Sequence, residues 1–426
     1  MIETIKNAWK IPDLRRKLLF VVFALVIFRF GYAIYVPYVD TKALADVFKQ
    51  YSDTLLGYFN TLSGGGFSQA SIFALSVYPY INSSIIMQLL QVAIPALERM
   101  VKDGGEEGRK KLASITRYVT IALSLLMGWT YYIMLRTSGV LTRTDLWSAI
   151  VIILTFTAGS SFIMWLGEQI NSKGVGNGIS LILFASIVSR GPSAVMGIIN
   201  GLKSGSMNVI SVIVILVVAV AMIAFIVFIT NAERRIPIQY AKRMVGRKMY
   251  GGQSTHLPMK VNMSGVMPVI FASSIVTFPG TIIQFLNPEE GSFWSNFGKA
   301  FSQGSLAYII VYALLIVGFA YFYATIQFNP IEVSNNLKRN GGFIPGFRPG
   351  KPTTDFIAKV LGKITLMGAL FLGIVAILPL IMSNIKGLGG LAIGGTSVLI
   401  LVGVALETVK QIEAQMLMRH YKGFLE

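Results

Sequence analysis

The chain has 426 residues, of which 54% are hydrophobic and only 13% are charged, and its mean hydropathy is +0.65. These values exclude an ordinary soluble globular domain and predict a membrane protein. Cysteine is absent, so a disulfide framework, a thiolate nucleophile and a cysteine-bound metal are excluded as well.

Ten apolar segments of membrane-spanning length follow one another along the chain. No small-residue cleavage site follows the first of them, so we expect a retained span rather than a signal peptide. The predicted spans cover residues 18–36, 72–95, 115–135, 146–167, 178–199, 208–230, 264–286, 306–327, 357–380 and 393–415. The predicted fold class is therefore an all-α, polytopic membrane protein with ten transmembrane helices.

An uncharged stretch with three consecutive glycines, NTLSGGGFSQASIF at residues 60–73, leads into the second span. A connection between two spans usually carries charge, whereas this stretch carries none. On composition alone it fits an exposed, flexible linker.

The distribution of Lys and Arg predicts the orientation of the chain. An even number of spans places both termini on one side, and most of the 37 basic residues lie in the N-terminal tail and the loops of that side. We therefore expect both termini in the cytoplasm, and the net charge of +18 follows largely from this topology.

Two of the cytoplasmic loops, residues 231–263 and 328–356, are too long to be simple connectors. The first contains seven Lys and Arg residues. We expect such loops to bind an anionic partner, for example ribosomal RNA or an acidic protein surface. A solvated surface facing lipid headgroups is the alternative.

The second and seventh spans share a short sequence pattern. Val-Tyr-Pro-Tyr-Ile at 77–81 corresponds to Val-Met-Pro-Val-Ile at 266–270, and a pair of serines follows each. Five spans separate the copies, so they cross the membrane in opposite directions, as in an inverted repeat. We expect each proline to kink its helix. Chance similarity between apolar segments is the alternative.

The sequence offers little for catalysis. Both histidines, His256 and His420, lie in cytoplasmic segments, and no metalloprotease or nucleophile-elbow motif is present. The spans contain almost no ionisable residues, with Arg29 and Glu407 as exceptions, whereas a transporter or proton pump usually needs such groups near mid-membrane. We therefore predict neither an enzyme nor a bound cofactor or metal.

Four segments in the same order resemble the signature segments of the SecY family, the central subunits of bacterial protein-translocation channels. They are SIFALSVYPYINSSIIMQLL at 71–90, RRIPIQYAKR at 234–243, VNMSGVMPVIFASSI at 261–275 and GGFIPGFRPG at 341–350. The similarity extends to KGVGNGISLILFASIV at 173–188 and GGTSVLILVGVALE at 394–407. One departure is the single Pro37 after the first span, where the family usually has two prolines.

The resemblance implies a clamshell of two inverted five-helix halves, residues 1–200 and 201–426, around an hourglass-shaped pore. Such a channel passes unfolded polypeptides across the membrane and releases transmembrane segments sideways into lipid. A small-solute secondary transporter is the alternative.

The resemblance also implies roles for particular residues. A short re-entrant half-helix at about 60–72, the plug, blocks the pore from outside; its residues are Asn60, Thr61, Leu62, Ser63, Gly64, Gly65, Gly66, Phe67 and Ser68. A ring of aliphatic side chains narrows the pore, formed by Ile81, Ile85, Ile179, Leu183, Ile270 and Ile400, with Leu399 as an alternative to Ile400. Signal peptides leave through a lateral gate between the second and seventh helices, with Pro79, Asn82, Ser83, Ser84, Pro268, Ser273 and Ser274.

The two basic loops resemble those that bind the SecA motor ATPase or the ribosome. The residues expected to dock these partners are Arg243, Arg247, Lys248, Arg339 and Arg348. The resemblance further implies the companion subunits SecE and probably SecG, and a location in the bacterial inner membrane. Because the chain has no nucleotide site, the driving energy must come from a partner or from the proton-motive force.

Overall fold

The structure is a computed structural model, which describes residues 2–50, 60, 63–205, 208–240, 243–245, 248–250, 254–286, 292–301, 305–383 and 395–422. The chain forms two compact units. The first comprises Met1–Ser206, Pro279–Gln303 and Val404–Glu426, and the second Met207–Phe278 and Gly304–Gly403. The expected halves, 1–200 and 201–426, stay a prediction, because these units are compact bodies rather than copies of a repeat.

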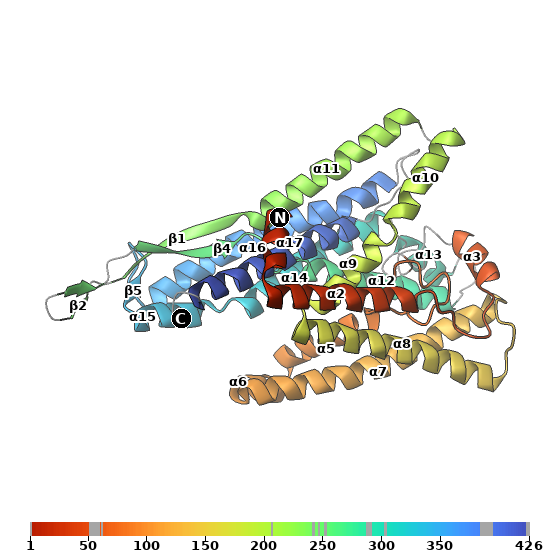
Figure 1. The fold of residues 1–426 in the computed structure, drawn as a ribbon, viewed down its shortest axis with the longest axis horizontal. Coiled ribbons are helices and arrows are strands. Elements are labelled where there is room, and N and C mark those ends of the chain that lie inside the picture. The colour runs from red at the N-terminus through yellow and green to blue at the C-terminus, as the bar shows by residue number, and fades with distance from the viewer. Residues whose placement is uncertain are drawn as a thin grey trace. The chain divides into compact units, whose positions relative to one another are not determined.

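The first unit is entirely helical in its described residues, apart from turns and connections. Its helices are α1 (Ile2–Lys10), α2 (Pro12–Gly31), α3 (Thr41–Gln50), α5 (Tyr78–Ala93), α6 (Pro95–Asp103), α7 (Gly105–Thr137), α8 (Leu146–Lys173), α9 (Gly178–Val188), α10 (Gly191–Lys203) and α13 (Phe293–Ala300). The helices α12 (Met267–Leu286) and α17 (Gly395–Lys422) each contribute residues to both units. Helices α7 and α8 pack side by side along most of their length (Figure 1).

The second unit combines long helices with a small sheet. Its elements are α11 (Val209–Asn231), β1 (Glu233–Tyr240), β2 (Arg243–Val245), β3 (Lys248–Tyr250), β4 (Ser254–Lys260), α14 (Leu306–Gln327), α15 (Pro330–Arg339), β5 (Gly342–Phe343) and α16 (Lys351–Ser383). Strand β1 lies between β4 and β5 and runs antiparallel to both. Strands β2 and β3 form a separate antiparallel pair at the end of this sheet (Figure 1).

Each of the ten predicted spans overlaps a helix, which confirms the all-α, polytopic fold class. Within the described part of the chain, six helices are long and apolar enough to cross a membrane, or seven if the bent pair α5–α6 counts as one span. Helix α2 falls outside this set because Arg15, Arg16, Lys17 and Arg29 interrupt its apolar sequence. The fifth span is divided into α9 and α10 at Arg190, where Pro192 takes a place in the first turn of α10.

The second span differs most from its predicted range. We expected a helix from residue 72, but α5 begins only at Tyr78. The axis bends by 96° between α5 and α6. The bend follows from Pro95, which pushes Ile94 before it into the extended conformation.

Candidate functional site

Residues 63–77, which we call the turn segment, form consecutive turns rather than a helix. The expected half-helix is therefore wrong for this part of the chain. Gly64 and Gly65 have φ of +67° and +92°, and Ala70 and Ser76 also have positive φ, which a right-handed helix does not contain. Of the other expected plug residues, Thr61 and Leu62 lie outside the described residues.

Most of the turn segment is buried in the first unit, so the interpretation as an exposed linker is wrong for these residues. Ser63 and Ser71 are 2% and 0% exposed, and Phe67 is 8% exposed. Gln69 is an exception and is exposed. An uncharged sequence suits this position, because burying a charge without a partner is costly.

Short polar side chains form hydrogen bonds with the backbone of the turn segment. The Asn60 Oδ1 atom accepts a hydrogen bond from the Ser68 amide at 2.9 Å, and the Ser63 Oγ atom accepts one from the Phe67 amide at 3.1 Å. The Ser68 hydroxyl donates to the Gly65 carbonyl at 3.0 Å. These bonds replace the helical pattern that the glycines interrupt.

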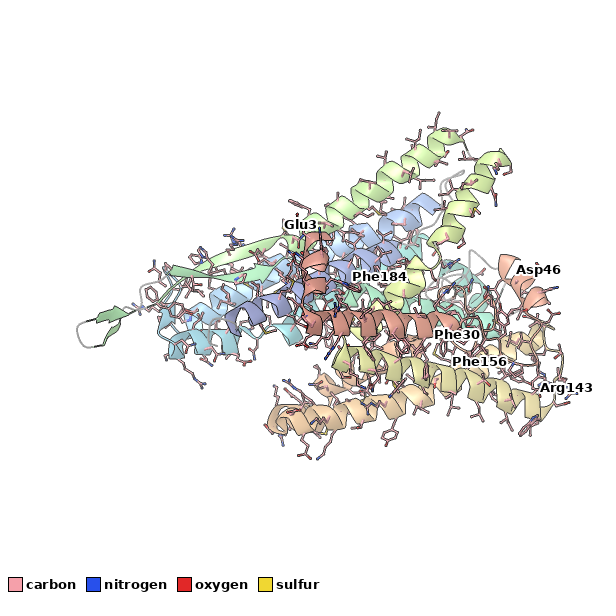
Figure 2. All side chains as sticks on the ribbon, viewed as in Figure 1. Glu3, Phe30, Asp46, Arg143, Phe156 and Phe184 are labelled. Carbon is pink, nitrogen blue, oxygen red and sulfur yellow. The ribbon has the colours of Figure 1, made fainter. Side chains whose placement is uncertain are left out.

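The backbone of the turn segment is also tied to the stretch that follows α2. The Val36 amide donates to the Ala70 carbonyl at 2.9 Å, and the Ile72 amide donates to the Ile34 carbonyl at 3.0 Å. The same stretch then pairs with the connection between α7 and α8, where the Asp40 amide donates to the Val140 carbonyl at 2.9 Å. Figure 2 shows Asp46 and Arg143 at this end of the unit, away from Glu3 of α1.

Phe67 is one of two aromatic anchors of the turn segment; the other, Phe73, packs against Phe28, Tyr32 and Phe162. The Phe67 ring stacks on Tyr131 of α7 with 4.1 Å between centroids and meets the edge of Phe48 of α3 at 5.6 Å. The Tyr131 hydroxyl donates to the Phe67 carbonyl, and Phe156 of α8 (Figure 2) packs on Tyr131 at 4.9 Å. The turn segment thus contributes Phe67, Ala70, Ala74 and Leu75 to a hydrophobic core of the first unit.

Gly64 fits against the end of α9. A Cβ atom added to Gly64 would lie 3.0 Å from the Ser186 carbonyl oxygen and 3.2 Å from the Ser189 Oγ atom. Ser189 Oγ donates to the Ser186 carbonyl at 2.8 Å and accepts a hydrogen bond from Arg29 Nη1 at 3.3 Å. Arg29, which the sequence left without a role, therefore fixes the hydroxyl that Gly64 contacts.

Helix α5 is buried on two opposite faces. Pro79, Ser83 and Met87 form one buried face, and the Ser83 hydroxyl donates to the Thr116 carbonyl of α7 at 2.7 Å. Ile81 and Ile85 are also buried and lie about 200° around the axis from Pro79 and Ser83, since successive helical residues are about 100° apart. The two isoleucines therefore point away from the face that is held by α7.

The other gate residues of α5 are less buried. Asn82 and Ser84 are half-buried. The Ser84 hydroxyl accepts a hydrogen bond from Gln88 Nε2 at 3.1 Å, within the same helix. Ser83 thus bonds to a neighbouring helix, whereas Ser84 bonds within α5.

The two prolines do not kink their helices, so this expectation is wrong. Pro79 is the second residue of α5, and Pro268 is the second residue of α12. In the first turn a proline loses no helical hydrogen bond, since the amide there has no partner in the helix. The two copies of the repeated pattern nevertheless place their prolines at the same helical position.

The expected ring residues of α9 begin directly after its N-terminus. Asn177 caps the helix, and its Oδ1 atom accepts hydrogen bonds from the Ile179 and Ser180 amides at 3.1 and 3.3 Å. Ile179 contacts α8, because a Cβ atom on Gly167 would lie 2.6 Å from its Cδ1 atom. Leu183, one turn later, is 5% exposed.

The remaining ring and gate residues belong to the second unit. Pro268 is buried and Ile270 half-buried. The hydroxyls of Ser273 and Ser274 donate to the Ile270 carbonyl at 2.8 and 3.0 Å, so both bond within their own helix. Leu399 and Ile400 are 2% and 3% exposed, so burial does not distinguish them. The ring itself stays a prediction.

The two long basic loops meet in one folded body. Gln239 and Tyr240 of β1, from the first loop, pair with Phe343 and Gly342 of β5, from the second. We call β1, β4, β5 and α15 the sheet platform. It packs on α14 and α16 over a shared apolar core, formed by Ile236, Ile238, Met259, Ala324, Leu337, Ile344, Ile357 and Leu361. The sequence did carry a local signal for β1, namely the alternation in Arg235-Ile236-Pro237-Ile238, although we expected no strand there.

Two of the expected docking residues lie on the surface of this body. Arg339 is the last residue of α15 and Arg348 lies in the turn between β5 and α16, and both are exposed. The turn is well fixed: the Arg348 carbonyl accepts a hydrogen bond from Thr353 Oγ1 at 2.8 Å, and the Gly350 carbonyl accepts one from Ser334 Oγ at 3.0 Å.

The other docking residues belong to the β2–β3 hairpin or lie beside it. Arg243 pairs with Tyr250, and Lys248 pairs with Val245. Arg247 lies outside the described residues.

The fold and this site define a class, namely polytopic helical membrane proteins in which a buried, non-helical segment precedes a membrane helix. A profile of the SecY family matches residues 71–409. The chain belongs to the SecY family, which confirms the resemblance found in the sequence.

Curated relatives support the same assignment. The protein translocase subunit SecY of Streptomyces coelicolor is 43% identical over 443 residues and covers 100% of both chains. That of Thermotoga maritima is 42% identical over 440 residues, covering 100% of this chain and 98% of its own.

Solved structures share the fold. A SecY channel studied for its plug domain matches with a TM-score of 0.68 at 19% identity, over 97% of each chain. The canine Sec61 of a ribosome–channel complex matches with a TM-score of 0.63 at 17% identity, also over 97% of each chain.

Proposed function

We propose that this chain forms the protein-conducting channel of a bacterial translocase. It passes unfolded polypeptides across the cytoplasmic membrane and releases apolar segments into lipid, and it acts as a channel rather than as an enzyme. The observation that carries this proposal is the turn segment: uncharged, non-helical and buried beside a membrane helix. Non-helical backbone at membrane depth is tolerated only inside protein or along a cavity.

In this proposal the turn segment is the plug. Residues 63–68, which belong to the expected plug, have contacts that suit a segment that must open. These contacts are mostly single hydrogen bonds of small residues, and Phe67 is the one large side chain among these six residues. A neutral hydrogen bond contributes about 1 kcal/mol and an aromatic pair about 0.5–1.5 kcal/mol. Interactions of this strength hold the segment in place and still allow its release.

The pore ring is proposed to consist of Ile81, Ile85, Ile179, Leu183, Ile270 and Ile400. Branched aliphatic side chains close around an extended polypeptide without requiring particular hydrogen bonds, and an apolar constriction resists ions by dewetting. The placement of Ile81 and Ile85, about 200° around α5 from Ser83, which bonds to α7, supports this role.

The lateral gate is proposed to lie between α5 and α12. Its residues are Pro79, Asn82, Ser83, Ser84, Pro268, Ser273 and Ser274. The internal hydrogen bonds of Ser273 and Ser274 support a surface that separates easily, because both hydroxyls keep a partner within α12 when a neighbouring helix leaves.

The sheet platform is proposed as the docking surface for the SecA motor or for the ribosome. Its apolar core and paired strands support this role, since a partner that pushes polypeptide needs a firm surface. The contact residues are Arg243, Arg247, Lys248, Arg339 and Arg348. The platform and both termini then lie in the cytoplasm, and SecE and SecG are the companion subunits.

The direct test is reconstitution of the chain with its companion subunits in vesicles, together with the motor, ATP and an unfolded secretory protein. We expect the secretory protein to become protected from external protease only in vesicles that contain the chain. Vesicles that take up a small solute down an ion gradient but protect no polypeptide would support the secondary transporter instead.

A further inference from the structure

Helix α13 carries a continuous aromatic surface. The rings of Phe293 and Phe297 stack with 6.2 Å between centroids, and Phe297 lies 4.7 Å from Phe301. Trp294 meets Phe293 at 5.8 Å and Phe297 at 6.5 Å. Large aromatic side chains thus cover one side of a helix of only eight residues.

This aromatic surface is open to the surroundings in the first unit. Phe293 and Trp294 are 73% and 53% exposed. The other side of the helix is polar, with Ser292 and Asn296 one turn apart. The exposure is therefore directional, as in helices that lie flat in a membrane interface.

The rest of α13 is fixed to α12. A Cβ atom added to Gly298 would lie 2.8 Å from Ile283 Cγ2, and Ile283 is only 6% exposed. The absence of a side chain at Gly298 lets the two helices approach closely. The depth of α13 in the membrane thus also sets the depth of this end of α12.

The contact with Ile283 places α13 beside the end of a predicted membrane span. Ile283 lies in the last turn of α12, which ends at Leu286 and covers most of the seventh predicted span, residues 264–286. A helix that packs on the last turn of a membrane helix lies near the membrane surface. In the proposed topology, with both termini in the cytoplasm, this end of the seventh span is the outer one.

We propose that α13 is an anchor that inserts Phe293, Trp294, Phe297 and Phe301 into the outer interface of the lipid bilayer. Trp and other amphipathic rings favour the headgroup level, where the ring is apolar and the indole N–H is hydrated. The occupant of this surface is the phospholipid bilayer, since an isolated aromatic face at interface depth meets lipid first.

The test uses the fluorescence of Trp294 in the full chain, assembled with its companion subunits in phospholipid vesicles. The other four tryptophans, Trp9, Trp129, Trp147 and Trp165, are replaced by Phe. We expect blue-shifted emission, loss of intensity with lipids that carry a nitroxide near the headgroup, a smaller loss with a deep nitroxide, and little loss with aqueous iodide.

A matched control moves the indole to the polar side of the same helix. In a chain with Trp294→Phe and Asn296→Trp, iodide should quench strongly and the shallow nitroxide weakly. A second chain that keeps only Trp165 of α8 reports insertion, because that exposed side chain on a membrane helix should be quenched by lipid nitroxides.

Two results would overturn the proposal. If iodide quenches Trp294 as strongly as the indole at position 296, the helix lies in water. If neither iodide nor the nitroxide lipids quench it while Trp165 responds to lipid, another protein surface covers α13. Neither result depends on polypeptide transport, so the proposed channel function is tested separately.

Discussion

Replacing Phe67 by Ala should release the turn segment from its buried position and let ions pass through the resting channel. The ring stacks on Tyr131 at 4.1 Å and meets Phe48 at 5.6 Å, and it is 8% exposed. Replacing a core Phe by Ala costs about 3–5 kcal/mol. Because Tyr131 and Phe48 belong to helices that remain in place, the substitution mainly destabilises the state in which the turn segment is buried.

The expected size of the effect follows from this energy. At about 3 kcal/mol the ratio of unseated to seated molecules rises about a hundredfold, since each 1.4 kcal/mol is a factor of ten. Tyr131→Phe removes only the hydroxyl that donates to the Phe67 carbonyl. A loss of about 1 kcal/mol there predicts an increase of about fivefold.

The assay is the conductance of resting channels in planar bilayers, without motor or substrate. We expect the leak to increase in the order Phe30→Ala, Tyr131→Phe, Phe67→Ala. Phe30 of α2 is the matched control, because it is an aromatic residue of the same unit that is 70% exposed (Figure 2). Equal conductance of Phe67→Ala and Phe30→Ala, in channels that still transport protein, would refute the assignment of the turn segment as the plug.

Three further predictions concern other parts of the site. Channels with Gly64→Ala should leak more ions than channels with Gly65→Ala. Both positions have positive φ, but only the methyl group added at Gly64 meets Ser186 and Ser189. Equal ion leaks would show that backbone strain alone is responsible. Arg348→Glu should abolish SecA-driven export with insertion unchanged, whereas Lys110→Glu, an exposed charge reversal on α7, should not; full export by Arg348→Glu would remove that residue from docking. Cysteines at Ser84 and Ser274 should crosslink and block transport, and full activity of the crosslinked channel would argue against a gate between α5 and α12.

The sequence predicted the helices well because their signal is local. Runs of apolar residues of membrane length located a helix in each of the ten predicted ranges, and the Asn177 cap and the break at Arg190 follow from nearby residues. The turn segment was harder to predict. Its conformation depends on hydrogen bonds to residues 34 and 36 and on a ring in α7, which lie far away in the sequence.

The sheet platform was missed for a similar reason. Tyr240 pairs with Gly342, about a hundred residues later, so no local window contains β5, although β4, which also pairs with β1, begins already at Ser254. The residue types of the gate were predicted, but not their bonding. That Ser83 bonds to Thr116 of α7, while Ser273 and Ser274 bond within α12, depends on which neighbour each helix face meets.

The most direct measurement is photo-crosslinking of a secretory polypeptide that is stalled during transport. A photoreactive residue at Ile85, on the face of α5 that α7 does not hold, should form a covalent adduct with the stalled polypeptide. The same residue at Leu154 of α8, which is 54% exposed, should react with lipid. Adducts at Leu154 and none at Ile85, in vesicles that do transport the polypeptide, would contradict the proposed path.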